Sequence, residues 1–408
     1  MTEKAFRYDV LADDEIRVPD GLRDVWRGFK EPPHQQPVWR NRHLLEWARA
    51  TLAWSAPLVT SPEVEELSRL LAEVADGRRR VLQCGDCVED PREATATHVR
   101  DRIRLIDELA ALMTAGSGLP VLRVGRLAGQ LAKPRSEPFE RVNGVDLPAF
   151  RGALVNRPGH TMADRSPDPV RLYHGYRMSR TVLAHLELLG RHPGQAGVDP
   201  VWTSHEALLL DYEIPLLRRA PGGSSLLTST HWPWIGERTR RHDGAHVQVM
   251  AAIDNPVACK VGPGISAGEL LELCAKLDPQ RRPGRLTLIA RLGAGRVTDT
   301  LPPLVRAVRR AGHPAIWLCD PMHGNTIRSP SGRKTRSVAD VVAEVERFQL
   351  AVLAGEGVPG GLHLETTPNT VAECVPVAGN EPVGPFTTLC DPRLNGDQAA
   401  RVVSAWHA

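Results

Sequence analysis

The sequence predicts an α/β fold in which eight parallel strands close into a barrel with helices on its outside. Eight short runs rich in Val, Ile and Leu recur along the chain, as expected of strands buried on both faces. They cover residues 80–86, 120–127, 200–204, 229–236, 257–263, 286–292, 314–320 and 361–366. Segments with the apolar spacing of helices lie between most of these runs. This alternation is typical of a (β/α)8 TIM barrel, and 408 residues suffice for one such barrel with an extension.

Three of the intervening segments have the clearest helical spacing, namely 267–277, 301–311 and 338–353. Asp299 and Thr300 stand before Leu301 and two prolines, which predicts that the second of these helices begins near residue 301. Gly312 predicts its end. Ser337 stands before the third segment and is suited to cap that helix.

The first 79 residues do not follow this alternation. A Pro-rich stretch at 31–38 is followed by two helical stretches at 39–54 and 62–75. We therefore expect an N-terminal helical extension, residues 1–79, packed as an accessory segment on a catalytic barrel formed by residues 80–408.

The connection at about 150–199 is longer than a strand-to-strand crossover requires. It is polar, is interrupted by Gly and Pro, and contains one helical stretch near 170–190. The sequence therefore predicts an elaboration of the barrel in this region.

The composition indicates a soluble globular protein and not a disordered or fibrous one. Apolar residues make up 42% and charged residues 24% of the chain, and the net charge is only +3, so no overall field favours nucleic acid. The N-terminus lacks the apolar core of a signal peptide, and no apolar run approaches the ~20 residues of a membrane span. Seven cysteines, spread through the chain, do not suggest a disulfide framework. We expect a cytoplasmic protein that binds neither nucleic acid nor membrane.

Four residues that end or follow apolar runs are candidate metal ligands: Cys87, His323, Glu365 and Asp391. One sulfur, one imidazole and two carboxylates can hold a divalent transition ion and leave a coordination position open for a substrate oxygen. We expect Mn²⁺ or Co²⁺, with Fe²⁺ or Zn²⁺ also compatible with these ligands.

The other strand ends are strongly polar and mostly cationic. Catalytic groups of such barrels gather at the C-terminal ends of the strands. The residues found there are Arg126, Lys133, Arg135, Ser136, Glu237, Arg238, Lys260, Arg291 and Lys334. Arg and Lys bind phosphate and carboxylate, and this density exceeds the need of one phosphate, which predicts two anionic substrates.

Some polar groups at these strands have plainer interpretations. His205 and His363 can be buried histidines bonded to backbone, and neither is assigned a role. Cys259 and Cys319 lie inside apolar runs and are expected in the core. Lys260 could act as a Schiff-base nucleophile as well as an anion contact, and spacing does not separate the two.

Several long motifs, in one order from about residue 35 to the C-terminus, resemble the class II (plant-type) 3-deoxy-D-arabino-heptulosonate 7-phosphate (DAHP) synthases. They are Leu-Gln-Cys-Gly-Asp-Cys at 82–87, Arg-Leu-Ala-Gly-Gln at 126–130, Lys-Pro-Arg-Ser at 133–136, Thr-Ser-His-Glu at 203–206, Trp-Ile-Gly-Glu-Arg-Thr-Arg at 234–240, Lys-Val-Gly-Pro at 260–263, Asp-Pro-Met-His-Gly-Asn at 320–325 and Cys-Asp-Pro-Arg-Leu-Asn at 390–395. The residues at 83–85, 231–234 and 255–260 are similar to those of the short family members associated with phenazine and related secondary-metabolite pathways.

The resemblance implies a condensation of phosphoenolpyruvate with erythrose 4-phosphate that releases phosphate and opens the shikimate pathway. It implies that the four candidate ligands bind the metal ion. Phosphoenolpyruvate would lie among Arg126, Arg238, Lys260 and Arg291, with Glu237. The sugar phosphate would be held by Arg135, Ser136 and Lys334, and Lys133 belongs to the same substrate-binding set. Lys260 or Glu237 would handle protons, and the enzyme would be a homo-oligomer, expected to be a dimer.

Other functions stay open at this point. An aminoDAHP synthase would use imino-erythrose 4-phosphate as acceptor, with the same metal and barrel. A Schiff-base aldolase would depend on Lys260 and not on metal. A barrel without activity, serving as a regulatory or scaffolding partner, would have no physical need for the whole set of ligands and cations.

The chain also departs from the family. Phe-Arg-Gly-Ala at 150–153 stands where longer members commonly have Tyr-Arg-Gly-Asp, and the connection near 190–200 lacks the helical insertion of feedback-regulated relatives. We therefore expect weak or absent inhibition by Phe, Tyr and Trp. Cys390 adjoins Asp391 and could lie near Cys87, so oxidative loss of the metal is a further hypothesis.

Overall fold

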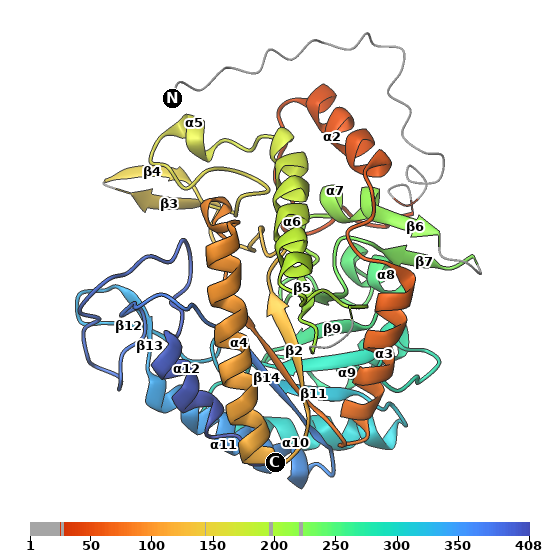
Figure 1. Cartoon of the computed structure of the whole chain (residues 1–408), viewed down its shortest axis with the longest axis vertical. Helices are drawn as coiled ribbons and strands as arrows, with labels where there is room; N and C mark the ends of the chain where they lie inside the picture. The colour runs from red at the N-terminus through yellow and green to blue at the C-terminus, as the bar shows by residue number, and fades with distance from the viewer. Residues whose placement is uncertain (1–24, 26–27, 143, 196–198, 220–222) are drawn as a thin grey trace.

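A closed barrel of eight parallel strands forms the centre of the protein, in a computed structural model that describes residues 25, 28–142, 144–195, 199–219 and 223–408 (Figure 1). The strands are β1 (Arg80–Gly85), β2 (Val121–Arg126), β5 (Trp202–Glu206), β8 (Trp232–Ile235), β9 (Val257–Val261), β10 (Leu286–Ala290), β11 (Ile316–Cys319) and β14 (Pro359–Glu365). Neighbours in the barrel follow chain order, and β14 pairs with β1 to close it. The predicted fold class is confirmed, and each predicted run overlaps one barrel strand.

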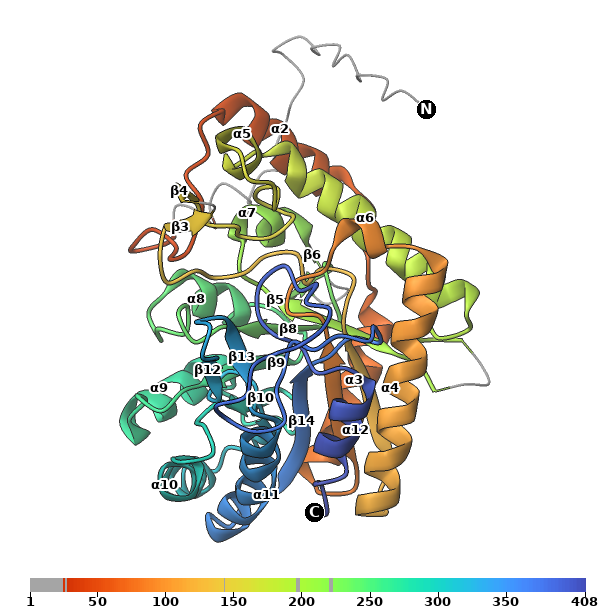
Figure 2. The same cartoon turned by 90° about the vertical axis from the view of Figure 1, so that its left-hand side faces the viewer.

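Helices surround the barrel, as Figure 2 shows for α4, α9, α10 and α11. They are α4 (Ala96–Ser117), α6 (Val170–Leu188), α8 (Ala245–Ala251), α9 (Ala267–Leu277), α10 (Val297–Arg310), α11 (Val338–Ala354) and α12 (Gly396–Val403). Ser337 caps α11 by accepting a hydrogen bond from the Asp340 N–H, as predicted. Gly312 follows α10 with a φ of 78°, a conformation that glycine adopts without strain and that ends the helix.

The predicted start of α10 at residue 301 is wrong, because the helix begins at Val297. Val297 is buried and extends the apolar stripe that continues through Leu301, Leu304 and Val308. Burying this stripe favours one more helical turn than the prolines suggest. Pro302 and Pro303 therefore lie inside the helix, where Pro302 is partly exposed and Pro303 is exposed.

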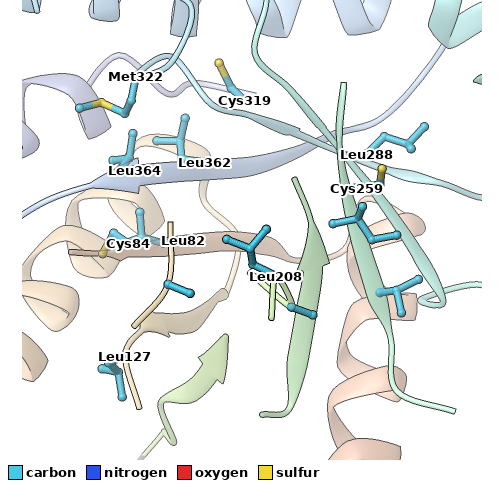
Figure 3. Packing of buried hydrophobic residues seen from close by; sticks show 14 of the residues in the cluster. Leu82, Cys84, Leu127, Leu208, Cys259, Leu288, Cys319, Met322, Leu362 and Leu364 are labelled. Atoms are coloured by element: carbon cyan, nitrogen blue, oxygen red, sulfur yellow. The ribbon is translucent and has the colours of Figure 1, made fainter. Parts of the chain in front are cut away.

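Side chains alternate between the two faces of each barrel strand. Leu82 and Cys84 of β1, with Leu362 and Leu364 of β14, point outward into the main core under the helices (Figure 3). Cys259 and Cys319 are buried in the same core, as predicted. The inward-facing positions are apolar toward the N-terminal ends of the strands, where Val81, Leu122, Val124, Trp202, Trp232, Ile289, Ile316 and Leu318 belong to one cluster.

The N-terminal segment contributes to that inner cluster. Leu67, Leu71 and Val74 of α3 (Ser61–Ala75) pack with the inward-facing residues, so α3 covers the N-terminal end of the barrel. A capping box at Thr60 fixes the start of α3. The preceding helix, α2 (Arg42–Trp54), packs on α6, where the Trp47 and Tyr173 rings meet edge to face at 6.0 Å.

Short elements elaborate the connections between strands. Between β2 and β5 lie the β3–β4 hairpin (Phe139–Val142 and Val145–Pro148), α5 (Met162–Arg165) and α6. Between β5 and β8 lie α7 (Leu210–Glu213), the 3₁₀ turn η2 (Ile214–Leu216) and the β6–β7 hairpin (Leu217–Arg219 and Ser225–Leu227), and between β11 and α11 lies the β12–β13 hairpin (Thr326–Arg328 and Lys334–Arg336). A further 3₁₀ turn, η1 (Pro91–Glu93), precedes α4. None of the helices in the described ranges has the length and apolarity needed to span a membrane.

Candidate active site

A cavity of about 500 Å³ lies at the C-terminal ends of the barrel strands. The thirteen residues that the sequence pointed to all line it: Cys87, Arg126, Lys133, Arg135, Ser136, Glu237, Arg238, Lys260, Arg291, His323, Lys334, Glu365 and Asp391. They come from at least six different strands or strand-following loops, so the barrel brings together residues that lie far apart in the sequence.

Three of the four predicted metal ligands meet in one cluster. One donor atom each of His323, Glu365 and Asp391 lies within 4.8 Å of the other two. The fourth, Cys87, is not part of this cluster but lies beside it, since its Sγ accepts a hydrogen bond from the Asp391 N–H at 3.4 Å. An imidazole and two carboxylates, with a thiol at the edge, are donors suited to a divalent transition ion.

Glu365 is fully buried at the end of β14 and is surrounded by cationic groups. Arg126 Nη2 lies 3.1 Å from Glu365 Oε1, and Arg336 Nη1 lies 2.7 Å from Oε2. Burial alone would raise the pKa of Glu365, but His323 and Arg336 hold it well below its usual value. Glu365 is therefore an ionised carboxylate in spite of its burial.

Asp391 forms ion pairs with two lysines, Lys133 and Lys334. Lys133 precedes the β3–β4 hairpin, whereas Lys334 belongs to the β12–β13 hairpin, so Asp391 links two loops over the cavity. Burial and the nearby positive charge of Lys133 lower the pKa of Lys334 to about 8. Both lysines line the cavity and are placed to exchange their carboxylate partner for an anionic ligand.

Asp320 connects a metal-ligand candidate to a substrate-binding candidate, and sequence reasoning gave it no role. Its carboxylate lies 2.8 Å from His323 Nδ1 and 2.5 Å from Lys260 Nζ. A hydrogen bond at Nδ1 leaves His323 Nε2 facing Glu365, at 3.3 Å. Burial lowers the pKa of Lys260 to about 8, and Arg126 adds to this effect while Asp320 opposes it. The position of Asp320 at the end of a strand, three residues before His323, was the available signal.

Cys87 and Cys390 are in contact beside the ligand cluster. Burial would raise the pKa of Cys87, but a hydrogen bond with the Cys390 thiol and the charge of Lys133 lower it to about 6. The same hydrogen bond, with burial, raises the pKa of Cys390 well above its usual value. Cys87 is therefore the thiolate of the pair, which is the form that binds metal.

The lining of the cavity contains nearly as many acidic as basic side chains, whereas the sequence suggested a mostly cationic lining. Seven Lys and Arg side chains line it, but so do six carboxylates. Four of these acids already pair with cations. Besides Glu365 and Asp391, Glu140 binds Arg135, and Glu237 Oε1 lies 2.9 Å from Arg240 Nη2. A divalent ion would shift this near balance toward the positive charge that anionic substrates require.

Two further residues hold the cavity wall in place, and sequence reasoning missed both. The Gln130 side chain donates to the Cys87 carbonyl at 3.2 Å and accepts from the Glu206 N–H at 3.0 Å, which ties the loops after β1 and β2 to the end of β5. The buried Glu89 carboxylate accepts the N–H groups of residues 128–130. Ala128 has a φ of 59°, and these three hydrogen bonds stabilise that unusual turn.

The two unassigned histidines are buried, but the expectation of backbone partners is wrong for both. His205 faces out of the barrel and bonds the Glu213 carboxylate at 2.9 Å. His363 faces inward and contacts the side chains of Gln83 and Arg126. Their strand positions differ in parity, which is why one faces the helices and the other the cavity floor.

Comparison with known families decides the assignment. The model of the Class-II DAHP synthetase family matches residues 23–198 and 189–405, which is nearly the whole chain. The chain belongs to this family. It is an enzyme of the DAHP synthase type.

Three curated relatives of this class II enzyme agree in name. A probable phospho-2-dehydro-3-deoxyheptonate aldolase from Pseudomonas fluorescens is 51% identical over 92% of this chain and 94% of its own length. A phospho-2-dehydro-3-deoxyheptonate aldolase from Streptomyces coelicolor is 38% identical, again over 92% and 94%. The phospho-2-dehydro-3-deoxyheptonate aldolase AroG of Mycolicibacterium smegmatis is 37% identical over 90% of each chain.

Proposed function

We propose that this protein condenses phosphoenolpyruvate with erythrose 4-phosphate to give DAHP and inorganic phosphate, with the help of one divalent metal ion. The observation that carries this proposal is a single cavity in which the His323–Glu365–Asp391 cluster lies among seven Lys and Arg side chains. Two phosphorylated substrates need such a set of cations, and an aldol-type attack needs an electrophile to be activated.

The residues present fit a metal ion. Besides the three clustered ligands and the Cys87 thiolate, Glu365 Oε2 has no hydrogen-bond partner within the described residues, although Arg336 lies close to it. A buried carboxylate oxygen in that state is suited to coordinate an ion. The bound ion supplies a Lewis acid for the aldehyde oxygen of the sugar phosphate. Mn²⁺ or Co²⁺ is the proposed ion, with Fe²⁺ or Zn²⁺ as alternatives.

Phosphoenolpyruvate would bind deep in the cavity, against Arg126, Lys260 and Arg291. Arg126 and Lys260 are buried and are fixed by ion pairs, and Arg291 Nη2 donates to the His323 carbonyl at 3.3 Å, so all three are held close to the metal ligands. Fixed cations at this depth orient the enol carbon toward the acceptor and stabilise the charge that develops there.

The sugar phosphate would bind nearer the mouth, at Arg135, Ser136 and Lys334. Arg238 Nη2 donates to Ser136 Oγ at 2.6 Å, which associates Arg238 with this phosphate as well as with phosphoenolpyruvate. Lys133 lies next to the metal-ligand cluster, because it pairs with Asp391.

Lys260 and Glu237 are the proposed proton-handling groups. A lysine with a pKa of about 8 can give or take a proton near neutral pH. Glu237 keeps one buried carboxylate oxygen without a hydrogen bond in the described part of the chain. After the carbon–carbon bond forms, water adds to the neighbouring carbon that bears the phosphate, and phosphate leaves by carbon–oxygen cleavage; both events require a proton to move.

The decisive experiment is to incubate metal-loaded protein with phosphoenolpyruvate and either erythrose 4-phosphate or its imino analogue, measuring phosphate release and product mass. DAHP as the main product supports the proposal, whereas the amino product supports the aminoDAHP alternative. Activity that survives chelation, together with borohydride trapping at Lys260, would identify a Schiff-base aldolase and refute it.

Two carboxylate variants make this test specific to the ligand cluster. Asp391→Asn should reduce both metal binding and phosphate release at least 100-fold, since one anionic ligand is lost. Asp397→Asn removes an exposed carboxylate on nearby α12 and should change neither.

The finer features of the activity are also proposals. We propose a cytoplasmic dimer that feeds secondary metabolism of the phenazine type, and weak or absent inhibition by Phe, Tyr and Trp. The short connection between α6 and β5 supports the last point. Steady-state assays with each amino acid test it, and analytical ultracentrifugation tests the dimer.

A further inference from the structure

A chain of hydrogen bonds crosses the interior of the barrel directly below the cavity. Gln83 Nε2 donates to Ser204 Oγ at 2.7 Å, Gln83 Oε1 lies 2.6 Å from His363 Nδ1, and His363 Nε2 lies 2.5 Å from Arg126 Nη1. The Ser204 hydroxyl donates to the Trp232 carbonyl. Every side chain in this Ser204–Gln83–His363 chain is fully buried, and Arg126 is only 3% exposed.

Barrel closure creates this contact. Gln83 and His363 are direct partners in the register of β1 and β14, the pair that closes the barrel. Two residues further along, Gly85 is the partner of both Glu365 and Arg126. Because alternate residues of a strand share a face, Gln83 and His363 form one layer inside the barrel, and Glu365 and Arg126 form the next layer toward the cavity.

The hydrogen bonds have a fixed direction. The Trp232 carbonyl can only accept, so the Ser204 hydroxyl donates its single proton there and accepts from the Gln83 amide N–H. This turns the Gln83 carbonyl oxygen toward His363, which must donate from Nδ1. At the other end the Arg126 guanidinium can only donate, so His363 Nε2 must accept. Both ends therefore require the same neutral tautomer, with the proton on Nδ1.

This tautomer fixes the orientation of Arg126. The guanidinium donates from Nε to the Asp86 carbonyl at 3.0 Å, from Nη2 to Glu365 at 3.1 Å and from Nη1 to His363. It also lies over the Trp234 ring, at 5.2 Å from the centroid. Three of its five N–H groups are thus engaged within the protein, which leaves two in a fixed plane for an anion in the cavity.

We propose that His363 is a positioning residue for phosphoenolpyruvate binding: as the Nδ1–H tautomer, selected by Gln83 and Ser204, it orients the Arg126 guanidinium toward the substrate anion. The proposal rests on the proposed function only in naming phosphoenolpyruvate as that anion. With the proton on Nε2 instead, two N–H donors would face each other at 2.5 Å, and the guanidinium would have to turn away.

The tautomer can be measured without any assay of activity. In protein labelled with ¹⁵N-histidine, long-range proton–nitrogen spectra distinguish Nδ1–H from Nε2–H, and the signals lost in His363→Gln identify the residue. We expect Nδ1–H in the wild type. In Ser204→Ala the Gln83 amide is free to turn, and the signals should move toward Nε2–H or a mixture. A wild-type ring protonated on Nε2, or a Ser204→Ala spectrum identical to that of the wild type, would overturn the proposal.

Kinetics test whether the tautomer matters for binding. In His363→Leu nothing accepts from Arg126, so KM for phosphoenolpyruvate should rise about tenfold or more, with KM for erythrose 4-phosphate unchanged within about twofold. In His363→Gln the amide can accept from Arg126 and donate to Gln83, so most of this loss should be recovered. His205→Gln alters a buried histidine on the outer face of β5 and is the control, with both KM values expected to stay near wild type.

The outcomes separate this proposal from the proposed function. If the wild type releases no phosphate from the two substrates, the proposed function fails, while the tautomer measurement still stands. If the wild type is active and folded His363→Leu binds phosphoenolpyruvate as tightly as His363→Gln does, the positioning role is refuted. If His363→Leu does not fold, KM for phosphoenolpyruvate in Ser204→Ala decides, since an unchanged value would also refute it.

Discussion

Replacing Glu344 with glutamine should change how the stability of the protein depends on pH. Glu344 is a buried residue of α11 that holds two active-site loops together. Its Oε1 accepts from the N–H groups of Leu292 and Gly293, at 3.1 and 2.8 Å, and its Oε2 accepts from Asn325 Nδ2 at 2.6 Å. These loops follow β10 and β11 and carry Arg291 and His323. Glu344 therefore supports two residues of the candidate active site from the side of α11.

The size of the effect follows from the pKa of this carboxyl group. Burial raises the pKa of Glu344 to about 7 from an ordinary value of 4.5, although hydrogen bonds from Gly293 and Asn325 oppose the rise. Between these two pH values the folded protein keeps a proton that the unfolded chain has lost. The stabilisation that this proton gives the folded state is fully present below pH 4.5 and is lost as the pH rises from 4.5 through 7. At about 1.4 kcal/mol per pH unit, the free energy of unfolding should fall by roughly 2.5 kcal/mol between about pH 5 and about pH 8 through this group alone.

Urea unfolding of wild type and Glu344→Gln, followed by tryptophan fluorescence in the presence of a chelator, measures this difference. The chelator removes the stabilisation that bound metal would add. The variant should be less stable than wild type near pH 5, because its amide N–H₂ faces the Asn325 donor, and should regain roughly 2.5 kcal/mol relative to wild type by about pH 8. Glu346→Gln, at an exposed position on the same helix, should give a difference that does not change with pH. A pH-independent difference for Glu344→Gln as well would refute the reasoning.

Two further substitutions test what holds the rest of the site. Arg393 bridges the buried carboxylates of Asp86 and Glu373, at 2.6 and 2.8 Å, so Arg393→Met should lower the free energy of unfolding, measured in urea, by about 3–5 kcal/mol. A loss below about 1 kcal/mol would show that these ion pairs do not stabilise the loop that carries Arg393. Gly361 has a φ of 147°, and a Cβ there would overlap the Val81 carbonyl oxygen, so Gly361→Ala should prevent barrel closure and yield insoluble protein. Gly264→Ala, in open space, should express and unfold like wild type, and a soluble, active Gly361→Ala would contradict the close approach of β1 and β14 at this residue.

The eight barrel strands and thirteen of the residues that line the cavity could be predicted from the sequence. Eight apolar runs separated by helical segments define the strands, and polar residues at the ends of those runs must meet at one mouth once parallel strands close. For this reason Lys260, Glu365 and the other strand-end residues could be selected without coordinates. Local patterns were weaker guides where tertiary burial competed with them, as at α10, where an apolar stripe that includes Val297 outweighed two prolines.

The tertiary structure alone decided which groups touch. Cys87 lies beside the ligand cluster and not within it, and Asp320 joins Lys260 to His323. Gln83 reaches His363 only because β1 and β14, at opposite ends of the barrel sequence, pair in one register. A sequence pattern reports which face of an element is buried, whereas hydrogen-bond partners depend on distances of a few ångströms between segments, and these are fixed only when the barrel closes.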